Sequence, residues 1–137
     1  MSAEDGPYDT SLSGVRVLLV DDNALVRAVV ADVLEAHGAT VISVESASRA
    51  LDVLPMERPD VLLTDLSMPE QDGFNLIRQV RALPPEQGGK TPAALVTALA
   101  AAQDRAEVLR AGFQFCLAKP VSTSELVAAV AILATKV

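Results

Sequence analysis

Residues 15–22 read Val-Arg-Val-Leu-Leu-Val-Asp-Asp, a short apolar run that ends abruptly in two acidic side chains. The length of the run and its β-branched content predict a buried β-strand. The next residues, Ala24 to His37, repeat apolar side chains at helical spacing, and Gly38 follows as the expected left-handed end of a helix. The stretch therefore predicts a strand, an acidic turn and a helix.

The same alternation of strand and helix continues to the end of the chain. Further strands are expected at Thr40–Val44, Val61–Thr64, Ala93–Thr97 and Phe115–Leu117. Further helices are expected from a Ser46 cap to about Leu54, over about Phe74–Leu83 and Ala101–Ala111, and from a Ser122/Glu125 capping box to about Leu133. Five alternations predict an α/β fold, a doubly wound parallel sheet with helices on both faces.

Length and composition predict one domain. The chain has 137 residues, of which 50% are hydrophobic and only 3% aromatic, so the core is expected to consist of Val, Leu, Ile and Ala. The first fourteen residues are small and polar and carry Gly6, Pro7 and Gly14. We expect residues 1–14 to form a flexible leader and residues 15–137 to form the domain.

Charge and cysteine content exclude several classes of partner. The net charge is −7 and the basic residues are scattered, which argues against nucleic acid as a partner. The single cysteine, Cys116, cannot form an internal disulfide, which fits a reducing compartment. No secretory signal opens the chain, and the most apolar segment, Leu126–Leu133, is far shorter than the roughly 20 residues that a membrane span needs. We expect a cytoplasmic protein without a membrane partner.

Polar side chains follow the predicted strands where each strand ends. Asp21 and Asp22 follow the first, Asp65 the third and Thr97 the fourth, and the fifth leads into Lys119. In a parallel sheet these carboxyl ends share one edge, where ligands bind. Clustered carboxylates repel one another and need a compensating cation, and hard oxygen ligands suit Mg²⁺. A carboxylate, a magnesium site, a hydroxyl and an ammonium are the groups that phosphoryl transfer onto an aspartate requires.

These residues resemble the receiver domain of two-component response regulators, over Val15 to about Thr135. The resemblance rests on Asp21-Asp22, on the segment Asp65 to Gly73 (DLSMPEQDG), on Thr97-Ala98 and on Lys119-Pro120. It implies a flavodoxin-like sheet of order 2-1-3-4-5 with five helices. The stretches Leu83 to Gly89 and Leu117 to Val121 resemble receivers attached to hybrid histidine kinases. We therefore expect the most similar members to be such receivers or single-domain response regulators.

The resemblance implies a phosphorylation site at Asp65 and a magnesium site around it. Asp22 and Asp65 would ligate Mg²⁺ directly, and the backbone carbonyl of Ser67 would be a third protein ligand. Asp21 would act mainly through metal-bound water.

The resemblance also implies the remaining chemistry and the partners. Thr97 and Lys119 would contact the phosphoryl oxygens, and the bond from Lys119 to Pro120 would be cis. The phosphoryl group would come from a histidine kinase or a histidine phosphotransfer protein, and a downstream protein partner would receive the output. Such a domain catalyses only its own phosphorylation and dephosphorylation, and Ser67 and Leu99 occupy the positions that tune the lifetime of the phosphate.

One position departs from the family pattern. Receivers usually have an aromatic residue three positions before the lysine, and this chain has Cys116 there. In the family the aromatic moves together with the threonine, here Thr97, so the usual route of activation is in question. Phosphorylation itself should survive, because Cys116 is outside the reacting set.

Two other functions stay open at this stage. A magnesium-dependent hydrolase that forms an aspartyl-phosphate would use similar groups, although such enzymes resemble the pattern Asp-x-Asp and carry a cap domain that this chain has no room for. A receiver that binds its partner without phosphate is the other alternative, and Cys116 is the residue that keeps it open.

Overall fold

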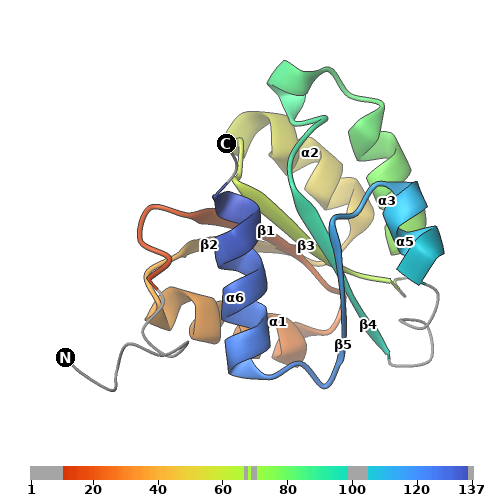
Figure 1. Cartoon of the computed structure of the whole chain (residues 1–137). Helices are drawn as coiled ribbons and strands as arrows, with labels where there is room; N and C mark the ends of the chain where they lie inside the picture. Colours follow the sequence, from red (N-terminus) through yellow and green to blue (C-terminus); the bar gives the residue numbers. More distant parts are fainter. Residues whose placement is uncertain (1–10, 67, 69–70, 99–104, 136–137) are drawn as a thin grey trace.

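The computed structural model describes residues 11–66, 68, 71–98 and 105–135. Five parallel strands form one sheet in the order β2-β1-β3-β4-β5 (Figure 1). The strands are β1 (Arg16–Val20), β2 (Thr40–Val44), β3 (Val61–Asp65), β4 (Ala93–Ala98) and β5 (Phe115–Lys119). The predicted parallel sheet and its strand order are confirmed.

Helices cover both faces of this sheet (Figure 1). They are α1 (Ala24–Ala36), α2 (Ala47–Glu57), α3 (Gly73–Arg81), α5 (Arg105–Ala111) and α6 (Thr123–Ala134), with a 3₁₀ turn, η3, at Pro85–Gln87. One buried cluster joins the sheet to α2, α3 and α5, and another joins the opposite face to α1 and α6. Within the described ranges, no helix is long and apolar enough to cross a membrane.

Strand β1 shows why its sequence is apolar without interruption. Val17 and Leu19 belong to the cluster under α1 and α6, whereas Leu18 and Val20 belong to the cluster under α2 and α3. Successive side chains of a strand point to opposite faces, so a strand at the centre of a two-sided sheet is buried on both. The carboxyl end of this strand is where the two aspartates emerge.

The element boundaries differ from the predicted ones at several places. Strands β4 and β5 extend to Ala98 and Lys119, and α2 continues beyond Leu54 to Glu57. Pro55 lies inside α2, near its C-terminal end, and has no backbone N–H to donate to the preceding turn. The predicted start of a helix at Ala101 lies outside the described residues.

The end of the expected leader packs against the domain. Leu12 is fully buried, and its backbone N–H donates to the carbonyl of His37 at 2.7 Å. The backbone N–H of Val15 in turn donates to the carbonyl of Leu12 at 3.0 Å. These contacts tie Leu12, inside the expected leader, to the following residues, and residues 1–10 lie outside the described part of the chain.

Candidate phosphoryl-acceptor and metal site

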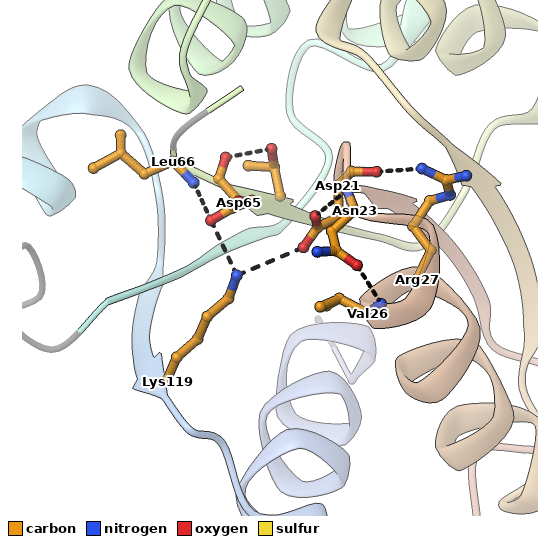
Figure 2. Close-up of polar contacts among 8 residues, drawn as sticks. Asp21, Asn23, Val26, Arg27, Asp65, Leu66 and Lys119 are labelled. Carbon is orange, nitrogen blue, oxygen red and sulfur yellow. Dashed lines mark hydrogen bonds and ion pairs between the residues drawn. The ribbon is translucent and has the colours of Figure 1, made fainter. Parts of the chain in front are cut away.

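Asp21 lies at the end of β1, and hydrogen bonds fix both its backbone and its carboxylate. Its backbone N–H donates to the carbonyl of Val44 at 3.2 Å, and its own carbonyl accepts from Arg27 Nη1 at 2.7 Å. The backbone N–H of Asn23 donates to Asp21 Oδ1 at 2.9 Å (Figure 2). Asn23 also caps α1, because its side chain accepts the N–H of Val26 at 3.0 Å. Asp21 is only 4% exposed, so its orientation is set by the turn around it.

Asp65 is the last residue of β3, and the backbone on its C-terminal side shapes its position. Its Oδ1 accepts the N–H of Leu66 at 2.8 Å, and the N–H of Gly73 donates to the carbonyl of Leu66 at 2.8 Å. A Cβ on Gly73 would lie 2.7 Å from the Asp65 carbonyl oxygen. Only glycine allows the start of α3 to approach β3 this closely.

Lys119 ends β5 and directs its ammonium at two carboxylates. Lys119 Nζ lies 3.3 Å from Asp65 Oδ1 and 3.6 Å from Asp21 Oδ2 (Figure 2). The bond between Lys119 and Pro120 is cis, as expected. The structure therefore brings together residues from three strand ends that are far apart in the sequence.

Three carboxylates gather at this edge. Asp21, Asp22 and Asp65 each offer a carboxylate oxygen within 4.8 Å of the other two, and Asp22 is exposed. Burial raises the pKa of Asp65 above its ordinary value, the neighbouring carboxylate of Asp21 also raises it, and Lys119 opposes both. The ionised form of Asp65 is therefore costly, and a second cation would stabilise it.

The donor set fits a magnesium ion. Mg²⁺ binds hard oxygen ligands at about 2.0–2.1 Å in an octahedron and keeps several waters. Ligand oxygens on such an octahedron are roughly 3–4 Å apart, which the three aspartates can meet with small side-chain movements. The expected third ligand, the backbone carbonyl of Ser67, lies outside the described residues, as does the predicted lifetime residue Leu99.

Thr97 lies on β4 and Cys116 on β5, which are on the other side of β3 from β1. Thr97 is buried in β4, one residue beyond the strand partner of Asp65. Cys116 is 8% exposed and belongs to the buried cluster that includes Val108 of α5 and Phe113. Burial raises the pKa of its thiol, and the charge of Arg105 opposes this.

A cavity of about 520 Å³ opens beside the acidic cluster. Asp21, Asp65 and Lys119 line it, together with valines of α1, apolar residues of the central strands, the segment after β5 and Leu126 of α6. Asp21 and Asp65 therefore border a space that can hold a group larger than water.

Sequence reasoning missed two residues that hold this edge, Asn23 and Arg27. Both have a local signal, because Asn23 stands immediately after the two aspartates at the start of an apolar helix and Arg27 follows it by one helical turn. The direction of the Arg27 side chain, back toward the end of β1, depends on the three-dimensional turn.

Known sequences and structures identify the family. The sequence pattern described as response regulator receiver domain matches residues 17–131. The chain belongs to the response regulator receiver family. A protein of Leptolyngbya boryana, described as an uncharacterized 14.6 kDa protein in the sodA1 3' region, is 42% identical to this receiver over 117 residues. That match covers 85% of this receiver and 88% of the Leptolyngbya protein.

Other similar proteins match this receiver over a segment of a longer chain or as an isolated receiver domain. The sensor histidine kinase RcsC of Salmonella typhi is 34% identical over 121 residues, covering 88% of this receiver and 12% of the kinase. Among solved structures, the receiver domain of sensor histidine kinase PA1611 from Pseudomonas aeruginosa has a TM-score of 0.80 and 31% identity. That similarity covers 90% of this receiver and all of the Pseudomonas domain, which holds a magnesium ion in its active site cleft. A Francisella response regulator receiver domain has a TM-score of 0.79 at 28% identity, covering 88% of this receiver and 97% of that domain.

Proposed function

We propose that this receiver takes a phosphoryl group from a phosphohistidine onto the carboxylate of Asp65 in a magnesium-dependent reaction. The observation that carries the proposal is the convergence of Asp21, Asp22, Asp65 and the Lys119 ammonium on one edge of the sheet. The phosphorylated receiver would then alter a protein interaction or pass the group along a phosphorelay.

The chemistry follows from the positions of these groups. A carboxylate oxygen of Asp65 attacks phosphorus, the P–N bond to the donor imidazole breaks, and the imidazole leaves with a proton from solvent. Oδ1 already accepts from Leu66 N–H and faces Lys119, so we assign the attack to Oδ2. Lys119 would then neutralise one phosphoryl oxygen, and Thr97 would donate a hydrogen bond to another.

The magnesium ion would be held by Asp65 and Asp22, by Asp21 through water, and by the backbone carbonyl of Ser67. When bound, it supplies positive charge that stabilises the transferring phosphoryl oxygens. The support for this assignment is the three-carboxylate cluster together with the raised pKa of Asp65. The magnesium ion in the active site cleft of the related Pseudomonas receiver also supports this assignment.

The partners we propose are a histidine kinase or a histidine phosphotransfer protein as donor, and a protein that recognises the phosphorylated form. The likeness to receiver segments of RcsC and of PA1611 supports a kinase-linked role. The net charge of −7 and the scattered basic residues support a protein partner rather than nucleic acid.

A labelling experiment tests the proposal. The protein is incubated with radiolabelled acetyl phosphate in Mg²⁺ or in EDTA, beside Asp65→Asn and a matched control, Asp72→Asn. Asp72 caps α3 through the N–H of Asn75, and asparagine can keep that bond. We expect one hydroxylamine-labile label per chain, dependent on Mg²⁺, present in Asp72→Asn and lost in Asp65→Asn.

Two outcomes would contradict the proposal. Full labelling of Asp65→Asn would refute the acceptor assignment. Many turnovers with small phosphate esters would favour the alternative of a magnesium-dependent aspartyl-phosphate hydrolase.

A further inference from the structure

Arg27, the fourth residue of α1, bonds to a backbone carbonyl next to the acidic cluster. Its Nη1 donates to the backbone carbonyl of Asp21 at 2.7 Å (Figure 2). Within the described residues, the ion pairs of Arg16 and Lys119 with nearby carboxylates do not include Arg27. Its charge is therefore directed at a peptide group, not at a carboxylate.

We infer that Arg27 is a positioning residue that holds the Asp21–Asp22 peptide and thereby sets the metal affinity of the acidic edge. The carbonyl it binds belongs to the peptide that joins the two aspartates, so a rotation of this peptide would move both side chains relative to Asp65. Asn23 holds the carboxylate of Asp21 from the other direction through Oδ1. The two bonds together fix the peptide and the side chain of one residue.

The expected size of the change in Mg²⁺ affinity follows from similar arrangements at metal sites. Groups that orient ligands without touching the metal change metal affinity about 10–100-fold when they are removed. Arginine suits the role better than lysine, because its planar guanidinium donates in a fixed direction and is less strongly hydrated. The inference rests on the magnesium part of the proposed function.

The direction in which Mg²⁺ affinity changes when Arg27 is removed distinguishes positioning from simple charge compensation. If Arg27 acted only as a positive charge, its removal would make the site more negative and Mg²⁺ would bind more tightly. If Arg27 positions the aspartates, its removal weakens Mg²⁺ binding although a repelling cation has gone. A purely structural residue would lower stability and leave the affinity unchanged.

Arg81 provides the matched control. Its guanidinium also donates to backbone carbonyls, those of Gly89, Thr91 and Gly112, at distances from 2.7 to 3.1 Å. These carbonyls lie in the segments that lead into β4 and β5, at the edge of the sheet opposite the aspartates. Arg81→Lys should therefore lower the melting temperature without changing the affinity for Mg²⁺.

The experiment is calorimetric titration of Mg²⁺ into the phosphate-free wild type, Arg27→Met, Arg27→Lys and Arg81→Lys, with thermal melts in EDTA for each. We expect the Kd for Mg²⁺ to be roughly 10-fold higher in Arg27→Met than in the wild type. It should be intermediate in Arg27→Lys and unchanged in Arg81→Lys. Unchanged or tighter binding in Arg27→Met would overturn the inference. If that variant melts below the assay temperature, Arg27→Lys decides the question, and a wild-type Kd in it would overturn the inference.

The same titration distinguishes this inference from the proposed function. Absence of Mg²⁺ binding by the wild type would remove the metal part of the proposed function itself. Binding by the wild type with equal affinity in the Arg27 variants would overturn the role of Arg27 alone.

Discussion

The two sides of the proposed acceptor site are built differently. On the acid side (Asp21, Asp22 and Asp65), hydrogen bonds from Asn23 and Leu66 and the ammonium of Lys119 orient the carboxylates of Asp21 and Asp65. On the hydroxyl side (Thr97 and Cys116), both side chains are buried, and residue 116 is a small thiol. From this difference we expect accepting a phosphoryl group and transmitting its presence to depend on separate residues.

Removal of the Lys119 ammonium should give the largest effect, because this group links the acid side to the phosphoryl group. Lys119→Met should slow labelling by acetyl phosphate by about 10²-fold, as loss of one preorganised charge does in other transfers. Affinity for Mg²⁺ should rise several-fold, because the ammonium next to Asp21 and Asp65 no longer competes with the metal. Labelling rates and metal titration measure the two effects separately, with exposed Lys90→Met as the control. A normal labelling rate would remove Lys119 from the reaction.

Gly73 tests how closely α3 must approach the acid side. A Cβ there would lie 2.7 Å from the Asp65 carbonyl and 3.0 Å from Leu95 Cδ1, so Gly73→Ala should cost about 1–3 kcal/mol of unfolding free energy. It should also weaken Mg²⁺ binding, because the backbone of Asp65 has to move.

Gly14→Ala is the matched glycine variant. Gly14 has a φ of +84° and no atom within 4 Å of an added Cβ. The substitution should therefore lower the free energy of unfolding only by the cost of a left-handed backbone, about 1–2 kcal/mol. Its Mg²⁺ affinity should stay at the wild-type value. Equal metal affinities in the two variants would show that the contact at Gly73 does not shape the site.

The raised pKa of Asp65 predicts how stability depends on pH without metal. Because the folded state holds this proton more tightly than the unfolded state, the contribution of Asp65 is fully present below its ordinary pKa of 3.8 and is lost as pH rises through the higher folded value. In EDTA at neutral pH, Asp65→Asn should therefore melt a few degrees above the wild type, and the gap should close in acid. Mg²⁺ should raise the melting temperature of the wild type and have little effect on the variant. A less stable Asp65→Asn at neutral pH in EDTA would contradict this sign.

The smallest effect is expected on the hydroxyl side. Cys116→Ala should leave the labelling rate by acetyl phosphate within about twofold of the wild type and cost roughly 1 kcal/mol in stability, since it removes one buried sulfur. Labelling kinetics and thermal melts measure both. A tenfold slower labelling would show that the thiol takes part in accepting the phosphoryl group, and the two sides would then not be separable.

The sequence predicted most of the acid side for a simple physical reason. Apolar strands buried on both faces leave few interpretations, and parallel strands bring their carboxyl ends to one edge, so Asp21, Asp65 and Lys119 had to meet. The contact between Arg27 and the Asp21 carbonyl was not predictable, because it depends on the path of the turn between β1 and α1. Burial of Leu12 was missed for a related reason: a single apolar residue in a polar segment has no periodicity to indicate its partner.

The central claim is that Asp65 carries the phosphoryl group, and the most direct measurement identifies the modified residue chemically. After incubation with Mg²⁺ and acetyl phosphate, borohydride reduction converts an aspartyl-phosphate into homoserine, and peptide mass spectrometry locates the converted position. Conversion at Asp65 alone, dependent on Mg²⁺ and on the phosphodonor, is the predicted result. Conversion at Asp21, Asp22 or Asp72, or no conversion in a chain that carries the label, would contradict the account.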